Sequence, residues 1–111
     1  MLGTITDQAE DFDLPRKVDD MPKYVVERDL PGAGKLSPQE LQAVSAKSVE
    51  ILRELAPDIQ WVKSYVVDDK LYCIYNASSE RLLYEHGRCA GIPVTRISEV
   101  RAIIDPVTGE G

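Results

Sequence analysis

The order of its hydrophobic segments is the feature of this sequence that most restricts its fold. Four stretches rich in β-branched and aromatic residues have the pattern of strands, and two stretches with helical spacing lie among them. The strands are predicted at residues 23–30, 59–67, 71–77 and 96–105, and the helices at 38–56 and 79–90. This β-α-β-β-α-β order predicts an α+β, ferredoxin-like fold, in which two helices cover one face of a four-stranded antiparallel sheet.

The start of the first helix has a strong local signal. Ser37 is a favoured N-cap residue, Pro38 suits the first helical position, and Glu40 lies three residues after the cap, as in a capping box. Pro57 restricts the residue before it to extended backbone, so the helix should end at about Ala56.

Length and charge predict one folded domain with two short extensions. The chain has 111 residues, and residues 1–20 hold six acidic side chains against two basic ones. Such a segment lacks a periodic apolar face, so residues 1–20 are predicted to be a mobile acidic extension. The ferredoxin-like domain is expected at 21–106, followed by a short tail at 107–111.

Composition argues against several classes of partner. The net charge is -6 and no cluster of Lys or Arg is present, which argues against a nucleic-acid partner. No apolar run is long enough to cross a bilayer, and the first residues lack the pattern of a signal peptide, so we expect no membrane association and a cytoplasmic location. The spacing of Cys73 and Cys89 suggests neither a disulfide nor a structural zinc site.

The uncovered face of such a sheet predicts a homodimer. Alternation along the second strand places Trp61, Tyr65 and Val67 on one side and Val62 and Val66 on the other, so both sides are apolar. A core of about 85 residues is also small for one chain. Packing the open face against a second copy would bury it, and two-fold homodimers are the commonest oligomers.

His86 is the only histidine of the chain, and it lies on the apolar side of the second helix. At about 100° per residue it falls between Leu82 and Ala90, while Arg81, Tyr84 and Arg88 fall on the opposite side. The imidazole should therefore point inward. Two roles stay open for it, a hydrogen-bonded core histidine or a ligand or acid/base group.

Two carboxylates lie inside predicted strands. Glu27 is in the first strand and Glu99 in the last, and we expect these strands to be adjacent at the centre of the sheet. A carboxylate there requires a partner. One interpretation is an ion pair with a basic side chain, namely Arg101, Lys63 or Arg28. The other is a polar cavity that combines Glu27 or Glu99 with His86.

Such a cavity would suit a particular kind of metal site. One histidine per chain excludes a three-histidine centre, and the cysteines lack the spacing of thiolate sites. A mixed site of His86 with Glu27 and Glu99 would fit octahedral ions such as nickel, manganese or iron.

Three segments resemble a known family. The stretches "MPKYVVERDLPGAGKLSPQEL", "DIQWVKSYVVDDKLYCIYNA" and "EHGRCAGIPVTRISEVRAIIDP" are similar to a family of small bacterial proteins that includes a nickel-binding, nickel-responsive protein of actinomycetes. The resemblance covers about residues 21–106. It implies the dimeric α+β barrel, in which two ferredoxin-like units pack sheet to sheet, and it suggests nickel as the metal.

Two functional hypotheses follow. The first is a cytoplasmic homodimer that binds nickel or a similar divalent metal through His86, Glu27 and Glu99. The second is a small monooxygenase-type or haem-handling enzyme, since such enzymes share the dimeric α+β barrel and an inward His86 would suit their pocket. Pocket size separates the two, because a substrate needs a cavity of a few hundred Å³.

Overall fold

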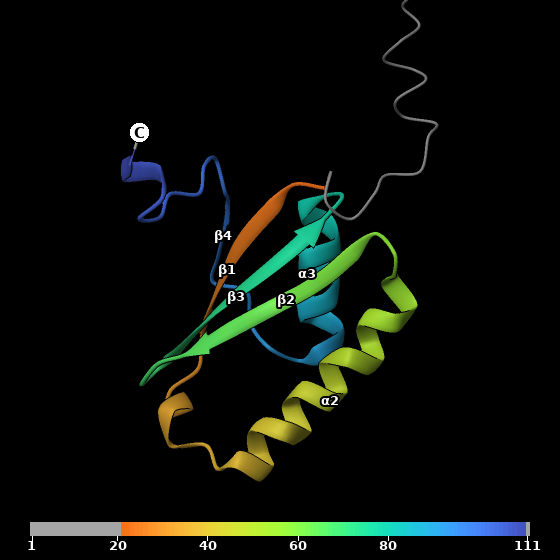
Figure 1. Cartoon of the computed structure of the whole chain (residues 1–111). Helices are drawn as coiled ribbons and strands as arrows, with labels where there is room; N and C mark the ends of the chain where they lie inside the picture. The colour runs from red at the N-terminus through yellow and green to blue at the C-terminus, as the bar shows by residue number, and fades with distance from the viewer. Residues whose placement is uncertain (1–20, 111) are drawn as a thin grey trace, which may run out of the picture.

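The structure is a computed structural model that describes residues 21–110, and within them two helices lie against one four-stranded sheet (Figure 1). The elements follow in the predicted order: β1 (Lys23–Asp29), α2 (Pro38–Leu55), β2 (Ile59–Val66), β3 (Lys70–Ala77), α3 (Glu80–Ala90) and β4 (Arg96–Glu99). Two 3-10 turns, η2 (Ala33–Lys35) and η3 (Thr108–Glu110), lie outside them. The predicted α+β, ferredoxin-like fold is confirmed.

Helix α2 begins at the predicted capping box. The Ser37 hydroxyl accepts a hydrogen bond from the Glu40 amide at 3.1 Å, and the Glu40 carboxylate accepts one from the Ser37 amide at 2.8 Å. Two amides that the helix itself leaves unpaired are thus satisfied. The helix ends at Leu55, one residue earlier than predicted, because Ala56 before Pro57 already has extended backbone.

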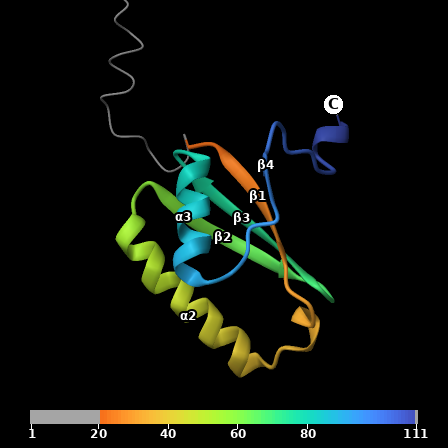
Figure 2. The ribbon, with the colours of Figure 1, turned by 180° about the vertical axis from the view of Figure 1, so that it is seen from behind.

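The strands lie in the order β2-β3-β1-β4, and each neighbouring pair is antiparallel. Strand β3 follows β2 through a tight hairpin and lies between β2 and β1. The other edge of β1 pairs with β4. The expectation that the first and last strands are adjacent is confirmed. The expectation that both are central was wrong, because β4 is an edge strand. Both helices cover the same face of the sheet (Figure 2).

An irregularity in β2 changes which of its side chains share a face. The register with β3 shifts between Trp61 and Lys63, and such a bulge reverses the alternation beyond it. Trp61 and Val66 consequently line one cavity on the helix side, whereas Tyr65 pairs with Tyr72 on the open side. The prediction that Trp61 and Tyr65 share a face was wrong for this reason.

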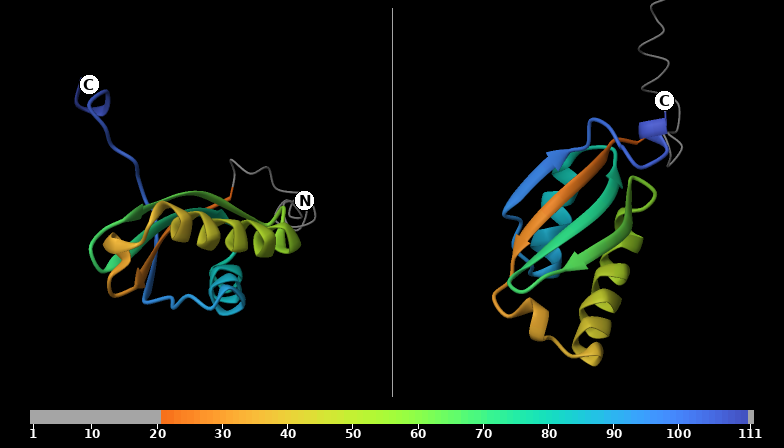
Figure 3. Two further views of the ribbon diagram at one scale, coloured as in Figure 1. Left: turned by 90° about the horizontal axis from the view of Figure 1, so that it is seen from below. Right: turned by 60° about the vertical axis from the view of Figure 1, so that its left-hand side comes forward.

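Strand β4 is shorter than predicted, and an extended arm follows it. Pairing with β1 ends near Lys23, where that strand begins, and the Val100 amide donates the last of these hydrogen bonds at 2.8 Å. Residues 101–110, the C-terminal arm, leave the sheet on the side opposite α3 (Figure 3, left). Ile103, Ile104 and Val107 in this arm are each about 70% exposed or more.

The core lies between the sheet and the two helices. Val26 from β1, Ala77 from β3 and Leu83 from α3 are fully buried there. No helix among residues 21–110 is both long and apolar enough to cross a membrane. The predicted acidic extension at 1–20 lies outside the described residues, and η3 falls within the predicted tail at 107–111.

Candidate functional site

Helix α3 places His86 in the interior, as its spacing predicts. The His86 side chain is 1% exposed, while Arg81, Tyr84 and Arg88 on the opposite side of the helix are exposed. Gly91 ends the helix with φ of 72°, a left-handed conformation that glycine adopts without strain.

The buried imidazole has no hydrogen-bond partner among residues 21–110. Neither Nδ1 nor Nε2 of His86 is paired within the described part of the chain. The ring lies edge-on to Tyr75 of β3, with 5.7 Å between the ring centroids. A buried polar atom without a partner costs about 1 to 3 kcal/mol, so two such atoms on one ring are unusual in a folded core. The described residues therefore do not supply the hydrogen-bond partner that a core histidine requires.

Arg28 is a second buried polar group, and the sequence interpretation did not place it in the site. Strand β1 alternates so that Tyr24, Val26 and Arg28 point toward the helices, and Arg28 is 1% exposed. Its Nη1 donates to the carbonyl oxygens of Ile92 and Pro93, both at 3.2 Å, and its Nη2 donates to the Tyr75 hydroxyl at 3.3 Å.

Arg28 has no acidic partner among the described residues. Among residues 21–110 no carboxylate forms an ion pair with its guanidinium. Its two neighbours in the strand, Glu27 and Asp29, point to the opposite face of the sheet and contact Lys70 there. The guanidinium charge is therefore buried without a counter-charge from this part of the chain.

Gly87 allows Arg28 to approach α3 closely. A Cβ at this position would lie 3.1 Å from Nη1 of Arg28 and 2.7 Å from a methyl group of Val94. The missing side chain lets the guanidinium reach the two carbonyl oxygens that follow the helix. Gly87 is thus a positioning residue that helical spacing alone does not identify.

His86 and Arg28 line the same small cavity between the sheet and the helices. Its volume is about 60 Å³. The polar side chains around it come from both helices and three strands, namely Arg28, Ser45, Ser48, Ser64, Tyr75 and His86. The cavity therefore holds hydrogen-bonding groups together with one permanent positive charge.

Burial and the guanidinium keep the imidazole neutral. Desolvation, and secondarily the positive charge of Arg28, lower the pKa of His86 from 6.5 to about 4. Desolvation raises the pKa of Tyr75 to about 12, which outweighs the opposing effect of Arg28. At neutral pH the Tyr75 phenol is uncharged and does not neutralise Arg28.

The structure separates the two predicted carboxylates. Glu27 points to the open face of the sheet, while Glu99 is paired with Tyr24 and so shares the side of the sheet that carries the helices. Each has a basic neighbour, since Lys70 Nζ lies 3.5 Å from Glu27 Oε1 and Arg101 Nη1 lies 3.8 Å from Glu99 Oε1. Glu27 therefore does not share the cavity of His86.

Residues 21–110 do not assemble a nickel site by themselves. Among the described residues no three His, Cys, Asp or Glu side chains lie together in a way that could hold a metal ion. His86 offers neutral nitrogen donors, but the Arg28 guanidinium beside it opposes a cation. The residues that surround His86 in this structure do not fit a divalent metal.

Comparison with known proteins identifies a family and a related structure. The family model described as "Nickel responsive protein SCO4226-like" matches residues 24–100. The crystal structure of SCO4226 from Streptomyces coelicolor A3(2) is similar with a TM-score of 0.63 at 12% sequence identity, covering 74% of this chain and 99% of that one. No curated protein sequence matches. At this identity the structural likeness shows a shared fold, and the family match extends over more than half of the chain.

Proposed function

Since the chain belongs to the family of SCO4226-like nickel responsive proteins, we propose that it is a homodimer that binds nickel or a similar divalent transition metal. Family membership is the observation that carries the choice of metal. The open sheet face and the C-terminal arm support the dimer.

The open face has an apolar centre that is available for a second copy. Val25 and Ile74 are paired across β1 and β3, and Tyr65 and Tyr72 are paired across β2 and β3 on the same side. The Tyr65 side chain is 54% exposed in the single chain. Packing two such faces together would remove this apolar surface from water.

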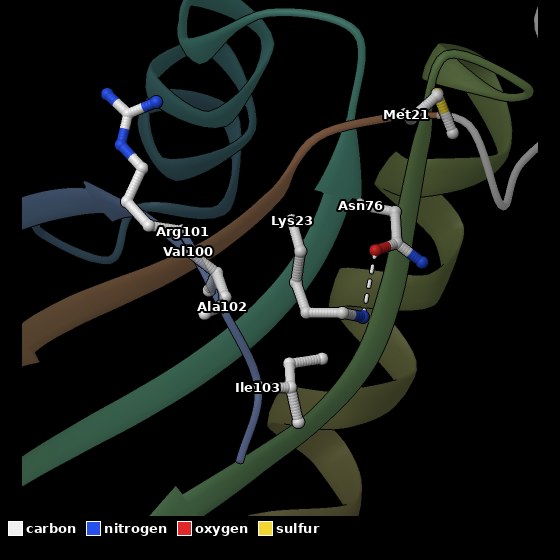
Figure 4. Close-up of a pocket in the computed structure, with 7 residues that line it drawn as sticks. All are labelled: Met21, Lys23, Asn76, Val100, Arg101, Ala102 and Ile103. Carbon is white, nitrogen blue, oxygen red and sulfur yellow. Dashed lines mark hydrogen bonds between the residues drawn. The ribbon is translucent and has the colours of Figure 1, made fainter. Parts of the chain in front are cut away.

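The C-terminal arm supports the same proposal. Between the arm and the edge of the open face lies a hollow of about 440 Å³, lined on one side by Lys23 and Asn76 and on the other by residues 100–103 (Figure 4). Lys23 donates a hydrogen bond to the Asn76 side chain at 2.9 Å across its floor. A second chain on the open face would contact both the hollow and the exposed Ile103 and Ile104.

We predict a sedimentation mass near twice 12.4 kDa at micromolar concentration. Replacing Ile103 and Ile104 together with Asp should shift the protein toward the mass of one chain, because four charges per dimer would enter an apolar interface. Val49→Asp is the control, because Val49 is a comparably apolar, partly exposed residue on α2. A wild-type mass of one chain would contradict the dimer.

Glu27 is the first candidate ligand in a dimer. It lies in a central strand on the open face, and its side chain is 24% exposed. Lys70 is shared between Glu27 and Asp29, at 3.5 and 3.8 Å, so the two carboxylates have one ammonium group between them. Sheet-to-sheet packing would bring the Glu27 carboxylate near the partner chain, where further oxygen ligands would complete an octahedral site. His86 is omitted from this ligand set because of Arg28.

We predict that Glu27→Gln weakens nickel binding at least tenfold in calorimetric titration of protein purified without a metal-affinity tag. The amide keeps the shape of the side chain but removes the negative charge that attracts the ion. Glu54→Gln, on an exposed position of α2, should leave the affinity unchanged.

Two further variants test the rest of the predicted ligand set. We expect Glu99→Gln and His86→Gln to change the affinity by less than about threefold, or about 0.7 kcal/mol. A tenfold loss in His86→Gln would show that the imidazole is a ligand and would contradict the proposed site. An absence of nickel binding by the wild-type protein would contradict the proposed function.

The size of the cavity disfavours the enzymatic alternative. A haem or a polyketide-sized substrate needs a few hundred Å³, whereas the cavity that His86 lines has about 60 Å³. We therefore do not extend the monooxygenase or haem-handling hypothesis to this chain.

A further inference from the structure

We propose that the cavity between the sheet and the two helices binds one small inorganic or carboxylate monoanion, held by Arg28 and His86. This cavity lies on the side of the sheet opposite Glu27. Anion binding there is independent of nickel.

The charge of the cavity is the first argument. The Arg28 side chain is 1% exposed, and a guanidinium carries a permanent positive charge. A buried charge without a partner is strongly unfavourable, and folded proteins compensate it with an opposite charge. The described residues supply no such charge, since the adjacent carboxylates of Glu27 and Asp29 lie on the other face. A bound anion would neutralise the guanidinium.

Unused hydrogen-bond donors are the second argument. A guanidinium has five N–H donors, and Arg28 makes three hydrogen bonds within residues 21–110. The neutral imidazole of His86 has one N–H, and neither of its nitrogens is paired there. The hydroxyl groups of Ser45 and Ser48 on α2 line the same space. The cavity therefore offers several donors from three elements to one acceptor.

Volume and surroundings define the class of ligand. A water molecule needs about 10 to 15 Å³ of such space, so a cavity of about 60 Å³ accommodates a few waters or one anion of similar size. Chloride, nitrate and formate belong to this class, whereas phosphate esters and nucleotides are too large. Trp61, Val66 and Leu71 form part of the wall, and an apolar wall strengthens the attraction between Arg28 and an anion.

The test measures thermal unfolding of the full chain at pH 7.5 without nickel. Sodium chloride, sodium nitrate or sodium formate replaces sodium gluconate, whose anion is too large for the cavity, at constant ionic strength. A ligand that binds only the folded state raises the melting temperature. We expect at least one of the three small anions to raise it saturably, by about 5 °C or more.

Three variants locate the effect. Arg28→Met and His86→Leu should each abolish the increase, whereas Lys70→Met, which removes a cation from the open face, should retain it. If Arg28→Met does not fold, the melting temperatures of His86→Leu and of the wild type in the four salts still test the proposal. Equal melting temperatures of the wild type in all four salts, or an increase that persists in His86→Leu, would overturn the proposal.

A crystal grown in sodium bromide provides a direct measurement. Anomalous scattering from bromide within hydrogen-bond distance of Arg28 and His86 would support the site. A cavity that holds only water both in such a crystal and in one grown in the salt that raises the melting temperature most would overturn it.

Discussion

Replacing Gly87 with Val is expected to destabilise the protein by about 2 to 3 kcal/mol and to lower its melting temperature by about 10 °C or more. Even a Cβ at this position would lie 2.7 Å from the Val94 methyl group and 3.1 Å from Arg28 Nη1. The two further methyl groups of Val would enter the same space. Relieving the overlap requires α3 or Arg28 to move, and movement of Arg28 breaks its hydrogen bonds to Ile92 and Pro93.

The matched control is Tyr84→Val, which places the same β-branched side chain on the exposed side of the same helix. We expect it to cost less than about 1 kcal/mol, since helix propensity and a little packing are all that change. The loss of stability in Gly87→Ala should fall between those of the two Val variants. Its Cβ meets the same overlap, but replacing Gly in a helix gains up to about 1 kcal/mol of helix propensity. Equal melting temperatures for Gly87→Val and Tyr84→Val would contradict the close packing of Arg28 against α3.

Local signals predicted most of the secondary structure. Helix α2 begins at a capping box of Ser37 and Glu40 and ends where Pro57 forces extended backbone on the residue before it. Both signals depend on residues within one turn, so the bounds of α2 follow from the sequence to within one residue. The inward position of His86 follows in the same way, because helical periodicity decides which side of α3 is apolar. Such features need no knowledge of the rest of the fold.

Features that depend on pairing between strands were not predicted. The bulge after Trp61 and the early end of β4 are set by the partner strands β3 and β1. Alternation within one strand also does not show how its faces match those of the next. The pairing of Tyr24 with Glu99 places Glu99 on the side away from Glu27, and no spacing within either strand reveals that separation.

Arg28 shows a different limit. The same alternation that makes Tyr24 and Val26 inward residues makes Arg28 inward too, so the signal was present in the sequence. Arginine is rarely buried, and Arg28 was considered only as one possible ion-pair partner of Glu27 or Glu99. The structure instead places this charge beside His86, which changes the chemistry expected of the cavity from cation binding to anion binding.

The acid sensitivity of the fold is expected to depend on His86. Its pKa is lowered to about 4 in the folded protein, against about 6.5 in an unfolded chain. The unfolded state therefore takes up a proton first as the pH falls. The stability that the neutral imidazole contributes is fully present above pH 6.5 and is lost progressively between pH 6.5 and 4. Between pH 7.5 and 5 this difference amounts to a loss of about 2 kcal/mol.

Denaturant unfolding of the wild type and His86→Leu at pH 7.5 and 5, in sodium gluconate, measures this contribution. His86 is the only histidine of the chain. The other titratable groups that line its cavity are Arg28 from β1 and Cys73 and Tyr75 from β3, beside uncharged serines from α2 and β2. Carboxylates elsewhere are common to both proteins, so they cancel when the two pH-dependent losses are compared. We expect the wild type to lose about 2 kcal/mol more than His86→Leu on acidification. Equal losses would mean that the imidazole is as easily protonated in the folded state as in the unfolded one. That outcome would contradict a buried His86 held neutral by desolvation and by the charge of Arg28.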